Sequence, residues 1–318
     1  MCVCVCLFVH VCIEDVEKEY LRSNKPNVVL VDATALACTA AKEIQIPCVI
    51  LSNFTWEFIY KNMHADLIRE GIETEITNQK FVDMIERCTE DYCNASHYLQ
   101  LPGYCDLPTG YDTEKVLTSP MMCRLAKCTR EDMRNRYNIP MHALVVVFGF
   151  GGQSFQNYKV NADTLPAGGQ DWYCLVLGCG PDADFGSDYF IPVGRDIYVP
   201  DVLTGADVML GKIGYGTVSE CLSSHVPLVY VKRAGWSEER PLVQLMERYS
   251  SIVEMPRSNF EEGKWANYLQ EAVALKSKLP IDRMKSELQY ENAISKIQAM
   301  IEIEVVTATT TTTTTTDT

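Results

Sequence analysis

The chain has 318 residues, which is enough for two domains of ordinary size, each with its own core. Hydrophobic residues make up 47% of the sequence and charged residues 22%, a balance that is typical of globular proteins and excludes a wholly disordered chain. The formal net charge of -14 is not offset by any basic tract. Because such a surface repels phosphate backbones, a nucleic-acid partner is not expected.

The fourteen cysteines are scattered, and several lie in apolar segments where free cysteine behaves as a small buried hydrophobe. No two of them have the C-x-x-C spacing of zinc ribbons and thioredoxin-type sites. We therefore expect no metal site, and a reducing, cytoplasmic location.

Residues 1–12 form an apolar run that is too short to span a bilayer and lacks the basic start of a signal peptide. We predict no integral membrane segment there. The range 1–13 stays unassigned, and we expect it to be a truncated or mispredicted start.

The next segment predicts a strand at Val28–Asp32, a helix at Thr34–Glu43 and a strand at Cys48–Ser52. Together they form a βαβ unit, whose connection we expect to be right-handed. Asp32 either lies at the functional edge of this sheet or caps the helix, and we favour the cap.

Four aromatic residues follow in the segment Asn53–Tyr60. Such a cluster could stack on a sugar ring, but aromatic side chains more often anchor a core or an interface, so we favour the core. A helix is then predicted at Phe81–Tyr98 and a strand at Tyr98–Leu101, before a loop-rich passage that runs to Pro120.

Five strands are predicted in the second half, at Leu144–Phe148, Trp172–Leu177, Ile197–Val199, Val208–Leu210 and Leu228–Val231. The first and the fourth each run into a glycine-rich turn, at Gly149–Ser154 and Gly211–Gly216. Parallel strands end at one edge of a sheet, and ligands of open α/β sheets bind at that edge. We therefore expect the two turns to meet there.

The second turn leads into a helix that is predicted to begin at Thr217. Backbone N–H groups without a neighbouring Cβ would lie there at the positive end of the helix dipole, which suits an anion or a polyhydroxyl ligand. Thr217 and Glu220 also have the spacing of a capping box, which explains both residues without a ligand. Both interpretations stay open on the residues alone.

Helices are predicted at Arg240–Tyr249, Trp265–Leu275 and Met284–Ile303, and the threonine-rich end of the chain should be disordered. The resulting domain organisation has an N-terminal α/β domain at 14–120, a linker helix at 121–142, a C-terminal α/β domain at 143–303 and a tail at 304–318.

Three separated motifs carry a resemblance to a known family: SNFTWEFIY at Ser52–Tyr60, LPGYC at Leu101–Cys105 and LGKIGYGTVSE at Leu210–Glu220. They resemble the glycosyltransferase-like amino-terminal region of plant-type L-arabinokinases over residues 14–300. The glycine turns, Pro227 and the pair Glu238 and Glu239 are similar to the donor-binding domain of UDP-sugar glycosyltransferases. The resemblance implies an α/β protein of the glycosyltransferase B fold, with two Rossmann-like domains with parallel sheets and a truncated N-terminal domain.

The resemblance also implies a nucleotide sugar in the interdomain cleft, with its diphosphate held by backbone N–H groups rather than by a metal. Glu220 would bind the ribose, Ile197 would flank the base, and Lys212 is either a partner of the diphosphate or an exposed loop lysine. Glu238 or Glu239 would bind sugar hydroxyls, although Ser237 and these two glutamates are also typical of a helix start. The implied donor-binding residues are Gly151, Gly152, Gln153, Ser154, Ile197, Lys212, Gly214, Gly216, Thr217, Glu220, Glu238 and Glu239.

No catalytic residue is assigned. An inverting transfer needs a general base, which the resemblance puts on a first glycine-rich strand turn that this sequence lacks, and neither His64 nor His97 has a partner in sequence. The phosphate loop of a sugar-kinase domain is also absent, so we expect no kinase activity from these residues. Two hypotheses remain: a glycosyltransferase-like enzyme that acts on a nucleotide sugar and a sugar or glycan acceptor without a cofactor, or a non-catalytic sugar-binding module of an L-arabinokinase-type kinase.

Overall fold

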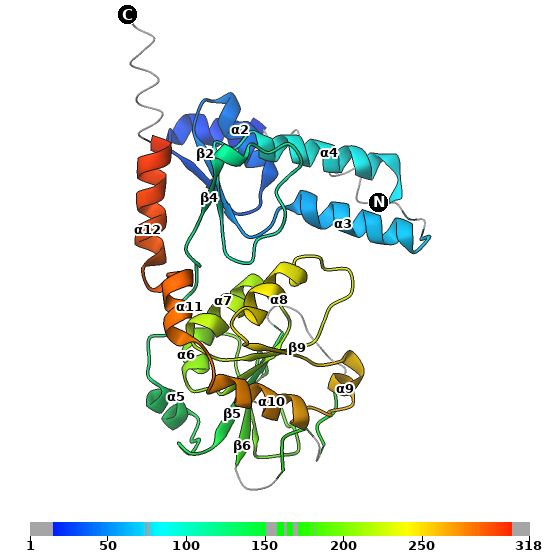
Figure 1. The fold of residues 1–318 in the computed structure, drawn as a ribbon, viewed down its shortest axis with the longest axis vertical. Coiled ribbons are helices and arrows are strands. Elements are labelled where there is room, and N and C mark those ends of the chain that lie inside the picture. Colours follow the sequence, from blue (N-terminus) through cyan, green and yellow to red (C-terminus); the bar gives the residue numbers. More distant parts are fainter. Residues whose placement is uncertain are drawn as a thin grey trace, which may run out of the picture. The chain divides into compact units, whose positions relative to one another are not determined.

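The computed structural model describes residues 15–306 except 73, 75–76, 151–157, 162–163, 168–170 and 181. The chain divides into two compact units, each with a parallel sheet and helices (Figure 1). The first unit contains the chain up to Met121, the segment Gly235–Glu238 and the chain from Asn292, and the second contains Met122–Ala234 and Glu239–Glu291. The expected class, α/β with two Rossmann-like domains, is confirmed.

The first unit has a four-stranded sheet in the order β1-β2-β3-β4, all parallel. Its strands are β1 (Val29–Val31), β2 (Cys48–Ser52), β3 (His97–Gln100) and β4 (Val116–Thr118). All five residues of β2 are buried, as expected for a parallel strand with neighbours on both sides. The helices of this unit include α2 (Ala35–Glu43), α3 (Trp56–Arg69), α4 (Gln79–Cys93) and α12 (Ala293–Met300), besides the helical residues 15–24.

A buried tyrosine joins three parts of this unit. The Tyr92 hydroxyl on α4 donates to the carbonyl of Ala33 after β1 at 2.6 Å, and it accepts from the backbone N–H of Trp56 at 3.1 Å. The helix α2 packs on β1, β2 and α4. These contacts fix the start of α3 at the carboxyl end of β2.

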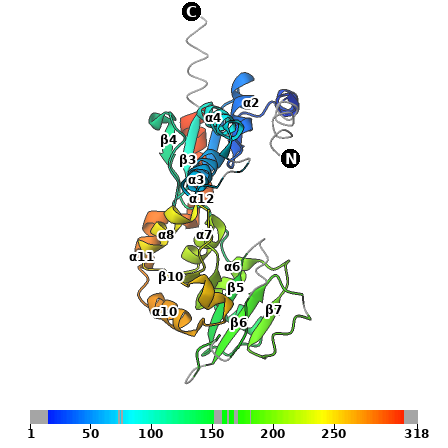
Figure 2. The same ribbon diagram turned by 90° about the vertical axis from the view of Figure 1, so that its right-hand side faces the viewer.

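The second unit has a six-stranded parallel sheet in the order β10-β9-β8-β5-β6-β7. Its strands are β5 (Leu144–Gly149), β6 (Trp172–Leu177), β7 (Phe190–Val193), β8 (Val208–Gly211), β9 (Leu228–Tyr230) and β10 (Ile252–Glu254). Its helices are α5 (Arg130–Arg136), α6 (Val199–Thr204), α7 (Tyr215–Ser223), α8 (Glu239–Glu247), α9 (Arg257–Glu261), α10 (Ala266–Lys276) and α11 (Ile281–Leu288). The helix α10 packs against β8, β9 and β10 (Figure 2).

Three strands were missed by the sequence analysis: β4, β7 and β10. Each has three or four residues and lies at the edge of its sheet, so no long apolar run marks it. Pro192 lies within β7, where an edge strand tolerates it because one side of the backbone makes no ladder hydrogen bonds.

Two predicted elements were wrong. Ile197–Val199 is not a strand, because Val199 begins α6 and Pro200 occupies its first turn, where a missing N–H costs little. The long helix predicted at Met284–Ile303 is interrupted at Gln289, which has a left-handed φ of 53° and ends α11.

The carboxyl ends of β5 and β8 lie side by side, as expected from the two glycine turns. Gly149 pairs with Gly211, and a Cβ on Gly211 would lie 2.4 Å from the carbonyl oxygen of Gly149. The two strands therefore approach closely only because residue 211 has no side chain.

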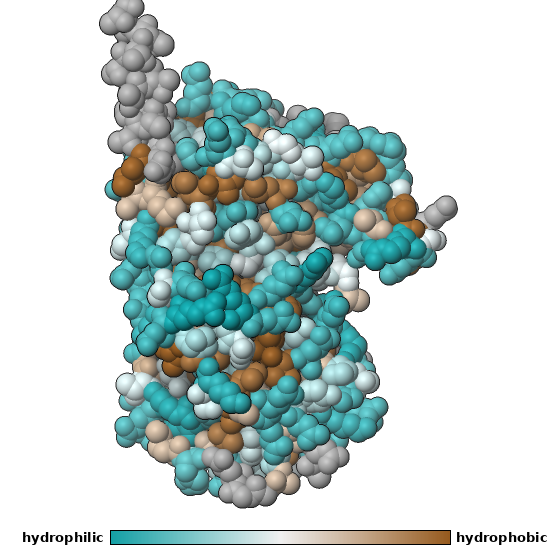
Figure 3. Space-filling view, in the orientation of Figure 1, coloured by the Kyte–Doolittle hydropathy of each residue, from teal (hydrophilic) through white to brown (hydrophobic). Residues whose placement is uncertain are grey.

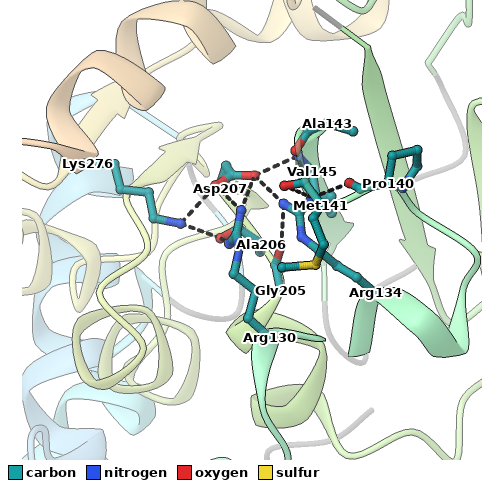
Figure 4. A network of polar contacts seen from close by, with 10 residues as sticks. All are labelled: Arg130, Arg134, Pro140, Met141, Ala143, Val145, Gly205, Ala206, Asp207 and Lys276. Carbon is teal, nitrogen blue, oxygen red and sulfur yellow. Dashed lines mark hydrogen bonds and ion pairs between the residues drawn. The ribbon is translucent and has the colours of Figure 1, made fainter. Parts of the chain in front are cut away.

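A buried carboxylate lies at the opposite, amino end of β8. Asp207 binds three cations: Arg130 at 2.9 Å, Arg134 at 2.9 Å and Lys276 at 3.0 Å (Figure 4). It also accepts the backbone N–H of Val145 at 2.9 Å. Burial acts to raise the pKa of Asp207, but Lys276 and Arg130 outweigh it and hold the pKa below its ordinary value.

Arg134 extends this cluster to the backbone. Its side chain is fully buried, and it donates to the carbonyls of Pro140, Met141, Ala143 and Gly205. The helix α5 is thereby fixed to the sheet of the second unit, although the sequence analysis placed it in a separate linker at 121–142.

The substitution Asp207→Asn removes the central charge and nearly keeps the shape. We expect the free energy of unfolding at pH 7, measured with urea, to fall by about 3 kcal/mol because Arg134 loses a buried counter-ion. The lowered pKa means that the carboxylate stabilises the fold above the ordinary Asp range, and that this contribution is lost as the pH falls through the lowered pKa. The difference in unfolding free energy between the wild-type protein and Asp207→Asn should therefore become smaller in acid. Wild-type stability of the variant at pH 7 would contradict this role, and Glu262→Gln, at an exposed ion pair, serves as the control.

The substitution Gly211→Ala tests the close approach of β5 and β8. The new Cβ would meet a backbone oxygen that cannot move without its strand, so we expect a loss of about 1–3 kcal/mol in unfolding free energy. Gly216→Ala is the matched control, because no atom lies within 4 Å of its Cβ position. Equal stability of the two variants would show that the strands separate easily.

Candidate functional site

The helix α7 begins without a side-chain cap. Its N-cap is Gly214, with φ -168° and ψ 152°, and this residue has no side chain that could accept from the first turn. Thr217 is the third residue of the helix and Glu220 lies farther along it, so of the two open interpretations the capping box is excluded. The structure forms a capping box elsewhere, with Thr129 and Asp132 at the start of α5.

A cation lies over this turn. The Nζ atom of Lys212 is 3.5 Å from the position that a Cβ on Gly214 would take. Gly216 is exposed, with no atom within 4 Å of its own Cβ position. The turn thus combines a helix start whose N-cap is a glycine, an ammonium group and open space beside Gly216, which together suit an anion. Gly151, Gly152, Gln153 and Ser154 of the other turn lie outside the described residues.

Glu220 is buried on α7 and pairs with Arg124, which the sequence analysis had not placed in the site. Nε and Nη2 of Arg124 lie 2.7 Å and 2.5 Å from the same carboxylate oxygen, Oε1. Burial raises the pKa of Glu220, and the hydrogen bond and charge of Arg124 act against that rise. Glu220 is thus a carboxylate held mainly by one partner.

Arg124 also lies over the ring of Tyr198, 5.5 Å from its centroid, and Lys127 lies 4.5 Å from the same centroid. The Tyr198 hydroxyl donates to the carbonyl of Leu125 at 2.9 Å. Ile197, the residue expected to flank a base, is the half-buried neighbour of this tyrosine. The structure therefore adds Arg124, Lys127 and Tyr198 to the surroundings of Glu220.

The two other expected carboxylates also have internal partners. Glu238 accepts from Asn53 at 3.0 Å and from the indole N–H of Trp236 at 2.7 Å, and these contacts lie in the first unit. In the second unit, Arg233 binds Glu239 through its backbone N–H at 3.1 Å and its Nε at 2.5 Å. Ser237 does not act as a helix cap, the alternative left open above, because its buried hydroxyl has no hydrogen-bond partner in the described structure.

The aromatic segment of the first unit is not a core, contrary to our expectation. The residues buried there are Asn53, Thr55, Glu57 and Ile59, whereas Phe54, Phe58 and Tyr60 are half-buried and Trp56 is exposed. Trp56 is 36% exposed and stacks on Tyr60 at 5.4 Å. The rings form a partly exposed cluster at the start of α3.

Asp32 is likewise not a helix cap. The N-cap of α2 is Thr34, and Asp32 instead accepts from the Ser52 hydroxyl at 3.1 Å. His97 lies on β3, whereas His64 lies on α3 with its ring 6.2 Å from that of Phe81. These positions do not assign a general base, and catalytic residues stay unassigned.

Within the described ranges, no cluster of three or more His, Cys, Asp or Glu residues could hold a metal ion. Among the helices of the same ranges, none combines the length and the apolar character needed to cross a bilayer. Hydrophilic residues cover most of the face of each unit that Figure 3 shows. The ten cysteines of the described chain are free thiols.

No family model matches the chain. Its sequence is 36% identical to L-arabinokinase from Arabidopsis thaliana over 264 residues, which are 82% of this chain and 24% of that protein. The chain therefore spans about a quarter of the length of this curated relative. The expected resemblance is confirmed at the level of sequence.

Several solved glycosyltransferases have the same fold. The calicheamicin glycosyltransferase CalG4 has a TM-score of 0.62 and 17% identity, over 95% of this chain and 82% of that one. The Phytolacca americana UGT2 complexed with UDP-2-fluoro-glucose and pterostilbene has a TM-score of 0.59 and 13% identity, over 92% and 80% of the two chains. The chain therefore has the glycosyltransferase B fold, and its sequence is similar to that of a part of L-arabinokinase.

Proposed function

We propose that the chain binds a nucleotide sugar, UDP-linked, at the carboxyl edge of its six-stranded sheet. The observation that carries this proposal is the uncapped start of α7, with Lys212 over the turn and buried Glu220 farther along the helix. Backbone N–H groups and the Lys212 ammonium offset the charge of a diphosphate. No metal is needed for this binding.

Glu220 supplies the second part of the proposed recognition. A ribose presents two neighbouring hydroxyl donors, and a carboxylate presents two acceptor oxygens at matching separation. The base would then lie toward Ile197 and Tyr198, where an aromatic ring offers a stacking surface. UGT2, which was solved with a UDP-sugar analogue, shares this fold and supports the choice of nucleotide.

In the enzymatic form of the proposal, the bound hexosyl-type group passes to a hydroxyl of a sugar or glycan acceptor. A general base takes the proton of that hydroxyl, the acceptor oxygen forms the new bond to the anomeric carbon, and UDP leaves. The α7 turn and Lys212 stabilise the negative charge of the departing diphosphate.

A second candidate function is a binding module without transfer. It is favoured by the 36% identity to L-arabinokinase, of which this chain matches only 24%. In this form the chain senses a sugar or nucleotide sugar, and chemistry belongs to another part of a longer protein. Product analysis with UDP-sugars and simple sugar acceptors separates the two forms, because only transfer releases UDP in step with a new glycoside.

Calorimetry and thermal shift with UDP, GDP, ADP and several UDP-sugars test the binding proposal. We expect UDP or a UDP-sugar to raise the melting temperature selectively, with about 2.7 kcal/mol of added stability at a ligand concentration of a hundred times Kd. A folded, cooperatively melting sample that responds to none of these nucleotides would overturn the proposal.

The substitution Glu220→Ala tests the ribose contact. We expect UDP affinity to fall by about tenfold or more, since a hydrogen bond to a charged group contributes about 1.5–3 kcal/mol. Fold stability should change less, because Arg124 is 58% exposed and can return to water. Ser223→Ala, on the same helix, is the control. Unchanged UDP affinity in folded Glu220→Ala would reject the ribose role.

A further inference from the structure

We infer that Arg124 is a latch on the ribose-binding carboxylate, which a nucleotide must open before it can bind fully. The inference rests on the proposed function of Glu220. It assigns to Arg124 a positioning role that sets nucleotide affinity. Every residue in the argument belongs to the second unit.

The latch is visible in the hydrogen bonds of Glu220. Both donors of Arg124 bind Oε1, at 2.7 Å and 2.5 Å, and no described residue donates to Oε2. Oε1 of Glu220 thus accepts hydrogen bonds from Arg124, whereas Oε2 can accept a hydrogen bond from a ligand. A ribose that uses both oxygens must displace the guanidinium from Oε1.

The exposures of the two side chains make this displacement feasible. The Glu220 side chain is 7% exposed, whereas that of Arg124 is 58% exposed. A buried carboxylate needs a partner when no ligand is present, because an unpaired buried charge is costly. Arg124 can leave toward solvent without such a cost, so ligand hydroxyls can replace it as donors to the same oxygen.

Tyr198 gives the latch a second contact. The Arg124 guanidinium lies 5.5 Å from the centre of the Tyr198 ring. This ring is the proposed stacking surface for the base. The closed latch therefore covers both the ribose carboxylate and part of the stacking surface. Opening it frees both for one ligand.

The latch predicts different behaviour for two anionic ligands. UDP carries both a diphosphate and a ribose, so its apparent Kd equals the intrinsic Kd divided by the fraction of protein in which Arg124 is open. Inorganic pyrophosphate carries no ribose and has no need to open the latch. General electrostatic attraction by Arg124 would instead strengthen the binding of both ligands.

The experiment is titration calorimetry of the full chain and its Arg124→Gln variant with UDP and with inorganic pyrophosphate. We expect Arg124→Gln to bind UDP about tenfold more tightly, which corresponds to about 1.4 kcal/mol. Pyrophosphate affinity should stay equal or fall. Arg124→Lys, which keeps the charge but offers a single nitrogen, should give an intermediate UDP affinity.

Lys278→Gln is the matched control. It removes one positive charge from an exposed side chain of the second unit, for which the structure records no contact with Glu220 or Tyr198. We expect no gain in UDP affinity from it. An equal gain in Lys278→Gln and Arg124→Gln would overturn the latch, since charge removal alone would then explain the effect.

The remaining outcomes separate the latch from the proposed function. If the wild-type protein binds UDP and folded Arg124→Gln binds it equally or more weakly, the latch is wrong and the nucleotide site stands. If neither folded protein binds any nucleotide, the proposed function itself is overturned, and the latch with it. Cooperative thermal melting of each variant establishes that it is folded.

Discussion

The second unit depends on the compensation of one buried carboxylate. Asp207 lies where β8 begins, and its charge is stable there only because Arg130, Arg134 and Lys276 converge on it. These cations come from α5 and α10, which are far apart in sequence, so the carboxylate holds both helices to the sheet. Arg134 then fixes the loop before β5 through backbone carbonyls.

The strand that starts at this cluster ends at the candidate site. Between Asp207 and Gly211 the strand β8 is fully buried, and its far end tolerates no side chain. The turn at Lys212 and Gly214 therefore rests on a strand that is fixed at both ends. A rigid support of this kind holds the backbone of the α7 turn in place, which would lower the entropy cost of binding the proposed ligand.

The three carboxylates expected to bind a ligand share one physical feature: each is nearly buried and each has an internal partner. Glu220 binds Arg124, Glu238 binds Asn53 and Trp236, and Glu239 binds Arg233. A carboxylate in such a place must be satisfied when the site is empty. In the proposed site, ligand binding by these residues would be an exchange of partners, and the exposure of the partner would decide how readily it occurs.

The sequence by itself determined the α/β class, the strands β1, β2, β3, β5, β6, β8 and β9, and the glycine turn before α7, because apolar runs and glycines act locally. It left undecided the short edge strands β4, β7 and β10 and the capping of α7, since these depend on neighbours rather than on pattern. Only the tertiary structure brought Arg124 to Glu220, across 96 positions of sequence, and Arg134 to Asp207. Such pairs form because a buried charge must be compensated by whichever side chain the fold brings near it. The spacing of residues along the chain does not show which side chain that will be.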